Sequence, residues 1–157
     1  MIKFTLKKHI AYTAPQEVFE TLSEPEGLKA LLPRMRKIEF KNRTAHKADV
    51  VMHIAIGQMF GVIRCEGQLA WVEPESLTFK VQSPLPVETV WKLTPARNGT
   101  DVHITMSLDL VPLLGPMAAF VPTDIVIEMM TNEIKHAMRE VEARIQRTRA
   151  QNRPAAA

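Results

Sequence analysis

The sequence predicts an α+β domain in which a curved antiparallel sheet of about seven strands wraps around a long C-terminal helix. Three observations support this: an alternating N-terminal stretch, turn-punctuated alternation over residues 34–110, and helical periodicity after residue 122. The chain has 157 residues, 46% of them hydrophobic and 24% charged, which is typical of one globular domain. We expect that domain to cover residues 1–150, with a disordered tail at 151–157.

Composition argues against several classes of protein. The single cysteine, Cys65, excludes an intrachain disulfide and favours a reducing compartment. The N-terminus has no unbroken apolar run, as a secretory signal requires, and prolines and carboxylates interrupt the most apolar stretch, 110–130. We therefore expect a cytoplasmic protein that does not insert stably into membranes.

The net charge of +3 is mild, and several arginines gather over residues 144–153. They suit the negative pole of a helix C-terminus, although contact with an acidic partner, RNA or a membrane surface stays open. We expect no nucleic-acid partner, and either a monomer or a weak dimer.

The first elements are a strand and two short helices. Residues 3–12 alternate, and Lys8 interrupts the otherwise apolar face of that strand. Pro15 suits the first position of a helix, Pro25 begins a second one, and Pro33 ends it.

Three turns set the register of the strands that follow. A two-residue loop at Asn98-Gly99 pairs Leu93 with Ile104 and Trp91 with Met106. The turn at residues 73–75 pairs Trp71 with Leu77, and a turn around Met59-Phe60 pairs Cys65 with Ile54. All three registers predict one inner face, formed by Met52, Ile54, Ile56, Ile63, Cys65, Leu69, Trp71, Leu77, Phe79, Val81, Trp91, Leu93, Ile104, Met106 and Leu108.

The last predicted element is a helix of roughly 25 to 30 residues that begins near residues 122–124. Its apolar stripe must press against the only large apolar surface available, the sheet. The stripe consists of Ile127, Met130, Ile134, Met138 (or Ala137), Val141 and Ile145.

This order of elements resembles the START-like, Bet v 1-like (SRPBCC) superfamily, which includes polyketide cyclase/dehydrase and lipid-transport proteins. The resemblance runs from Lys3 to about residue 148 and is carried by HIAYTAPQEVFETLSEPEGL over residues 9–28, by GTDV at 99–102 and by Gly115-Pro116. It implies a helix-grip fold with a cavity between sheet and long helix that binds a lipid, sterol, quinone or polyketide. A fainter similarity of residues 24–33 to carbon monoxide dehydrogenase accessory subunits implies an assembly role.

The residues themselves indicate little chemistry. The five histidines never fall at ligand spacing, Cys65 is predicted in an apolar setting, and no nucleophile elbow or phosphate loop occurs. Lys8 and Glu88 would need bulges to point inward, while Asp109 and Asp124 lie near the expected cavity mouth, as acid–base groups or as helix caps. We therefore expect no catalytic residues, no metal and no cofactor.

The leading hypothesis is a binding protein for an apolar small molecule, and we lean away from an enzyme. An oligoketide cyclase/dehydrase-like enzyme and an assembly protein that docks through its surface remain alternatives. An exposed apolar patch at residues 113–121 would favour docking or a lid. The predicted ligand-binding residues are Ile63, Cys65, Leu69, Trp71, Phe79, Trp91, Leu93, Ile104, Met106, Met117, Phe120, Ile127, Met130 and Ile134.

Overall fold

The computed structural model describes residues 1–31, 34–55, 61–83 and 86–151. Its sheet is antiparallel and runs in the order β1-β7-β6-β5-β4-β3-β2. The helical elements are α1 (Pro15–Leu22), α2 (Pro25–Leu31), α3 (Val111–Leu114), η1 (Gly115–Phe120) and α4 (Thr123–Gln151). The strands are β1 (Ile2–Ala11), β2 (Met35–Lys41), β3 (Lys47–Ala55), β4 (Val62–Val72), β5 (Ser76–Ser83), β6 (Val87–Ala96) and β7 (Gly99–Leu108).

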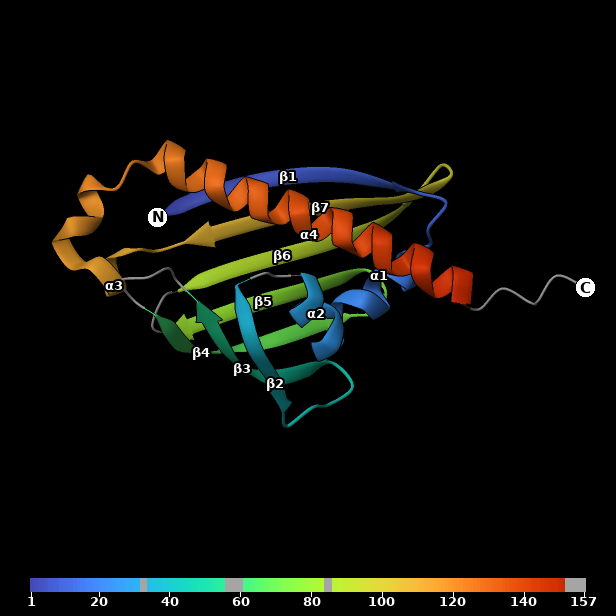
Figure 1. Ribbon diagram of the computed structural model, residues 1–157, viewed down its shortest axis with the longest axis horizontal. Coiled ribbons are helices and arrows are strands. Elements are labelled where there is room, and N and C mark those ends of the chain that lie inside the picture. Colours follow the sequence, from blue (N-terminus) through green and yellow to red (C-terminus); the bar gives the residue numbers. More distant parts are fainter. Residues whose placement is uncertain (32–33, 56–60, 84–85, 152–157) are drawn as a thin grey trace, which may run out of the picture.

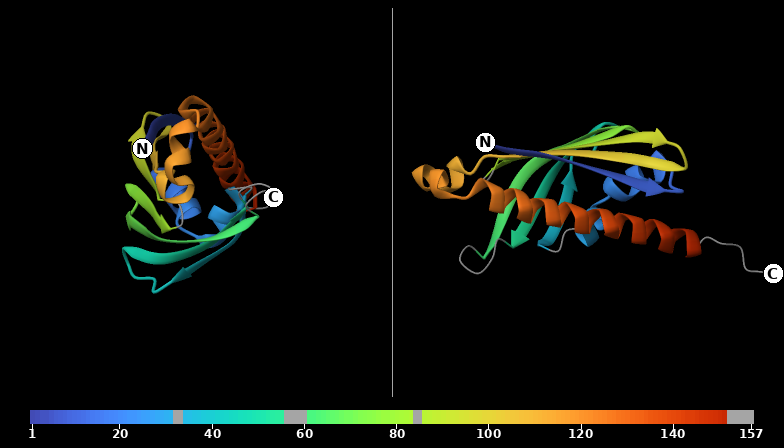
Figure 2. Two further views of the ribbon diagram at one scale, coloured as in Figure 1. Left: turned by 90° about the vertical axis from the view of Figure 1, so that its left-hand side faces the viewer. Right: turned by 90° about the horizontal axis from the view of Figure 1, so that it is seen from above.

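The sheet curves around α4, which crosses its concave side (Figure 1). The end-on view in Figure 2 shows the sheet curling beneath the helix, with α1 and α2 at the far end. The predicted helix-grip fold is therefore confirmed, including the seven strands, the two short helices and the length of the last helix. Residues 152–157 of the predicted tail lie outside the described residues, whereas Gln151 is the last residue of α4.

One predicted hairpin register is correct and two are shifted by two residues. Trp71 pairs with Leu77 as expected. At the β6–β7 hairpin, however, Leu93 pairs with Val102 instead of Ile104. Cys65 likewise pairs with Met52 on β3, while the predicted turn at Met59-Phe60, like Ile56, lies outside the described residues. A shift of two preserves the face on which every side chain lies, so the predicted inner face survives both errors.

Gly99 explains the shift at the β6–β7 hairpin. It is the first residue of β7 and pairs with both Ala96 and Ala11, so the loop is Arg97-Asn98. A Cβ on Gly99 would lie 2.2 Å from the carbonyl oxygen of Ile10, and only glycine permits so close an approach. Asn98 instead takes the left-handed conformation, with φ 61°.

Lys8 corrects a second expectation, because it needs no bulge to face the helix. The β1–β7 register is continuous, and Lys8 pairs with Val102 of the inner face. Its ammonium group lies 3.5 Å from the Glu142 carboxylate of α4. This ion pair links the helix to the edge strand β1. A second ion pair, between Arg149 and Glu17 at 2.6 Å, links the helix to α1.

Candidate functional site

The inner face of the sheet is not equally buried along its length. At the end near α1, the inward side chains Ile10, Leu93 and Val102 are at most 3% exposed. At the opposite end, beside α3, the register places Ile2, Leu108, Val87 and Val81 in one row across β1, β7, β6 and β5.

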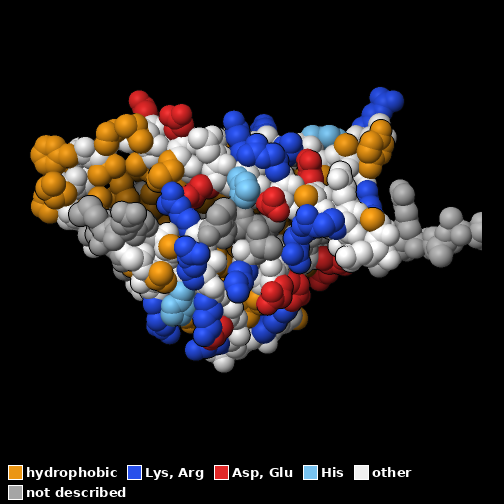
Figure 3. Space-filling model, viewed as in Figure 1, with side chains coloured by type: hydrophobic (Ala, Val, Ile, Leu, Met, Phe, Trp, Pro, Cys, Tyr) orange, Lys and Arg blue, Asp and Glu red, His pale blue; other side chains and the backbone are white. Residues whose placement is uncertain are grey.

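Within that row only Leu108 is buried, and the other three side chains are partly exposed. The next row contains Phe4 and Phe79, which are also partly exposed, and Ile54 and Ile63 form a similar pair on β3 and β4. Apolar side chains that point inward yet still meet solvent show that the sheet is covered less closely at this end, where the surface is hollowed (Figure 3). We call this region the apolar cleft and define it by Phe4, Ile54, Ile63, Phe79, Val81, Val87 and Met130.

The long helix shows the same gradient. Its buried side chains all lie at residue 134 or beyond: Ile134, Ala137, Met138, Val141 and Ile145. The first half carries Ile127 and Met130, which are partly exposed. The helix packs against β1, α1 and α2, and its part from residue 134 on is the more deeply buried, while the part before it covers the apolar cleft less closely.

Exposed hydrophobic side chains gather at this end of the molecule. Figure 3 shows them over α3, η1 and the start of α4, with the surface hollowed between them. They include Val111, Met117, Phe120, Ile125 and Met129, which are 41–79% exposed. A patch of this kind on a soluble domain usually marks a binding surface or the mouth of a ligand site.

The predicted ligand-binding residues fall into three groups. Ile63, Phe79, Ile127 and Met130 are partly exposed, three of them in the apolar cleft as defined. Met117 and Phe120 are 63% and 79% exposed on η1, and so they lie on the surface near the mouth. The remaining residues are buried in the core: Cys65, Leu69, Trp71, Trp91, Leu93, Ile104, Met106 and Ile134.

The predicted ligand-binding set left out Phe4, Ile54, Val81 and Val87 of the apolar cleft. It also left out one polar residue of this region, Thr89. It lies on the inner face of β6, where it pairs with Phe79 and Met106, and it is only 7% exposed. The signal was present, because a threonine stands between apolar residues on the apolar face of the predicted hairpin.

Trp71 lies at the other end of the sheet, where it serves a structural contact. Its indole N–H donates to the Ala45 carbonyl oxygen at 2.8 Å, and the Arg43 guanidinium lies 5.6 Å from the ring centroid. Arg43 also donates to both oxygens of Glu24, at 2.9 and 3.2 Å, and this pair raises the pKa of the guanidinium.

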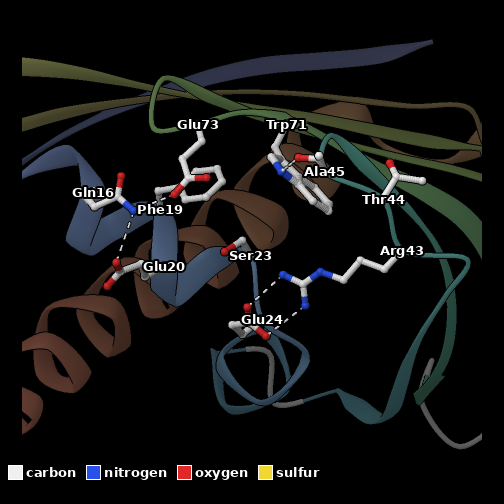
Figure 4. Close-up of a pocket in the computed structure, with 10 residues that line it drawn as sticks. All are labelled: Gln16, Phe19, Glu20, Ser23, Glu24, Arg43, Thr44, Ala45, Trp71 and Glu73. Atoms are coloured by element: carbon white, nitrogen blue, oxygen red, sulfur yellow. Dashed lines mark hydrogen bonds and ion pairs between the residues drawn. The ribbon is translucent and has the colours of Figure 1, made fainter.

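These groups border a polar surface pocket of about 270 Å³ beneath α1 (Figure 4). Its lining consists of Gln16, Phe19, Glu20, Ser23, Glu24, Arg43, Thr44, Ala45, Trp71 and Glu73. Its polar side chains already bond to one another, because Arg43 donates to Glu24 and the neutral Gln16 amide donates to Glu73.

The remaining residues that could carry out chemistry, Cys65, His9 and Asp109, are each buried or hydrogen-bonded within the protein. Burial raises the pKa of the Cys65 thiol, which favours the unreactive protonated form. His9 lies on the outer face, with Nδ1 2.8 Å from an Asp101 carboxylate oxygen. Asp109 accepts a hydrogen bond at 3.1 Å from the amide of Val111, the first residue of α3. Among the described residues, no group of three histidine, cysteine or acidic side chains could hold a metal ion.

Comparison with known proteins places the chain in a family. A family model described as polyketide cyclase / dehydrase and lipid transport matches residues 1–146. No curated protein is significantly similar in sequence. Within the described part of the chain, no helix has the length and hydropathy needed to cross a membrane.

Solved structures share the fold at low sequence identity. The protein TTHA0849 from Thermus thermophilus is 19% identical with a TM-score of 0.74, over 93% of this chain and 98% of that one. The Zhui aromatase/cyclase from Streptomyces sp. R1128 is 11% identical with a TM-score of 0.71, over 92% and 94%. The chain also matches 53% of the di-domain aromatase/cyclase StfQ of the steffimycin pathway, at 14% identity and a TM-score of 0.73 over 95% of its own length.

These neighbours establish the helix-grip fold, and the family model spans nearly the whole chain. The chain therefore belongs to the polyketide cyclase/dehydrase and lipid transport family.

Proposed function

We propose that this protein binds a hydrophobic small molecule between the sheet and α4, and that the molecule enters through the apolar cleft. The observation that carries this proposal is the partial exposure of inward-facing apolar side chains at the α3 end of the sheet. Covering such surface with an apolar ligand is favourable by roughly 25 cal/mol per Å² removed from water. Small-molecule sites typically combine such an apolar lining with few polar groups.

Two further observations support the proposal. The family description includes lipid transport, and two structural neighbours are named as aromatase/cyclases. The predicted residues Ile63, Phe79 and Met130 belong to the apolar cleft, and buried neighbours such as Met106 would form its floor. Methionine suits a floor of this kind because its flexible thioether adapts to varied apolar shapes.

The test begins with native mass spectrometry of the purified protein and solvent extraction of any bound compound. Binding of 1-anilinonaphthalene-8-sulfonate, a fluorescent probe of apolar surface, is then measured for the wild type and for two variants at adjacent positions. Ile63 faces inward at the apolar cleft, whereas Val62 is 55% exposed and faces outward. We expect Ile63→Asp to weaken probe binding at least tenfold, because it places a carboxylate on the apolar lining, and Val62→Asp to leave it within about twofold.

Thermal unfolding of both variants shows whether each is folded at the assay temperature. Equal binding by two folded variants would contradict the proposed site. A clean apo mass together with no probe binding to the wild type would contradict ligand binding itself.

A cyclase-like enzyme is the second candidate, and the names of the structural neighbours favour it. The same experiment separates the two functions. A bound compound recovered with its mass and its NMR spectrum unchanged after prolonged incubation supports binding alone, whereas loss of water or a new ring in that compound supports catalysis.

A further inference from the structure

Most buried polar side chains on the inner face already have partners within the protein. The Thr100 hydroxyl donates to the Thr13 carbonyl oxygen at 2.6 Å, and the Trp71 indole N–H donates to Ala45. Lys8, farther out on β1, faces Glu142. Burying a polar group without a partner is unfavourable, so these pairings are expected.

Thr89 and Trp91 are different. Both residues are 7% exposed and both face inward on β6, two positions apart. Among the described residues, neither the Thr89 hydroxyl nor the Trp91 indole N–H takes part in a hydrogen bond. In the same part of the chain, every side-chain nitrogen or oxygen atom that solvent cannot reach does have a hydrogen-bond partner. Each of the two polar groups is therefore reached by solvent, although the side chain that carries it is otherwise buried.

Strand register places both groups beside the apolar cleft. Thr89 pairs with Phe79 of the apolar cleft on one side and with Met106 on the other. Trp91 lies one inward position deeper, next to Leu77 and Ile104, which are almost fully buried. Two residues along a strand span about 7 Å, so the two groups can contact the same small molecule.

We propose that Thr89 and Trp91 form a polar subsite on the floor of the apolar cleft, and that the ligand is an apolar molecule bearing an oxygen that accepts hydrogen bonds, such as a ketone or an ester. This inference rests on the proposed function. An indole N–H can only donate, and a threonine hydroxyl can donate or accept, so the shared requirement is an acceptor on the ligand. A pure hydrocarbon would leave both groups unpaired.

The test compares two probes of nearly the same shape, 9-fluorenone and fluorene, which differ in one carbonyl oxygen. The chain has two tryptophans, so a ¹H–¹⁵N spectrum contains two indole signals, which Trp71→Phe and Trp91→Phe assign. We expect fluorenone to move the Trp91 indole signal downfield and to leave that of Trp71 in place. Fluorene should bind more weakly and cause no downfield shift.

Thr89→Val removes the hydroxyl and keeps the shape of the side chain. It should weaken fluorenone binding about 3- to 10-fold without weakening fluorene binding, and Thr89→Ser should restore the preference for fluorenone. Without ligand, Thr89→Val should keep or raise the melting temperature because no protein hydrogen bond is lost. The matched control Thr100→Val should lower it by about 2 to 6 °C, because it breaks the bond to Thr13.

The outcomes separate the two proposals. If both probes bind equally and Thr89→Val changes neither affinity, the protein binds apolar molecules but the polar subsite is wrong. The subsite is also wrong if Thr89→Val lowers the melting temperature as much as Thr100→Val does. If neither probe binds the wild type and no compound is extracted from it, the proposed function and the subsite both fail.

Discussion

The unequal burial of α4 can be tested with two methionines on that helix. Met138 lies in the second half and is 1% exposed, whereas Met129 lies in the first half and is 41% exposed. If only the second half anchors the helix to the rest of the domain, truncating the two side chains to alanine should have very different effects on stability.

The expected magnitudes follow from burial. Truncation of a buried methionine to alanine destabilises by about 2–5 kcal/mol, because apolar contacts are lost and a cavity remains. For a domain of this size, each kcal/mol lowers the melting temperature by roughly 2–4 °C, so Met138→Ala should lower it by about 4 to 20 °C. Met129→Ala should change the free energy of unfolding by about 0.5 kcal/mol or less, because little surface is buried there.

The assay is urea unfolding followed by far-UV circular dichroism, with the slope of the transition fitted separately for each variant. Equal destabilisation by the two variants would refute the burial gradient and, with it, the open end of the apolar cleft. A small effect of Met138→Ala with an unchanged slope would show that the second half of α4 is not the anchor described above.

Two further predictions concern the ion pair between α4 and α1 and the glycine that ends α3. Hydrogen bonds from Arg149 lower the pKa of Glu17 below its ordinary value of 4.5, so this pair stabilises the fold above that pH and loses its effect as pH falls through the lowered pKa. Glu17→Gln should therefore reduce the free energy of unfolding by about 0.5–1 kcal/mol at pH 7 and by much less at pH 3. Urea unfolding at the two pH values measures this difference. An equal loss at both would contradict a stabilising ion pair. Gly115, which ends α3, has φ +58°, and no atom lies within 4 Å of a Cβ built on it. Gly115→Ala should therefore destabilise the fold by about 1 kcal/mol through backbone strain alone. An unchanged melting temperature would contradict that strain.

Helix-start residues and hydrophobic periodicity in the sequence were sufficient to predict the fold class. Pro15 and Pro25 begin the two short helices as expected, and the helical periodicity beyond residue 122 corresponds to α4. The hairpin register was correct at the turn between Trp71 and Leu77. It was shifted by two at the β6–β7 hairpin, because the close approach of Gly99 to Ile10 on β1 is a contact between residues far apart in sequence.

The sequence by itself determined which side chains face inward, since strand alternation has a period of two and tolerated both register errors. Only the tertiary structure decided how deeply each of them is buried, because burial depends on which part of α4 lies above a given strand position. The same holds for the polar groups of the inner face. Trp71 and Trp91 look equivalent in the predicted strands, yet the β2–β3 loop brings the Ala45 carbonyl to Trp71, and no described residue brings an acceptor to Trp91.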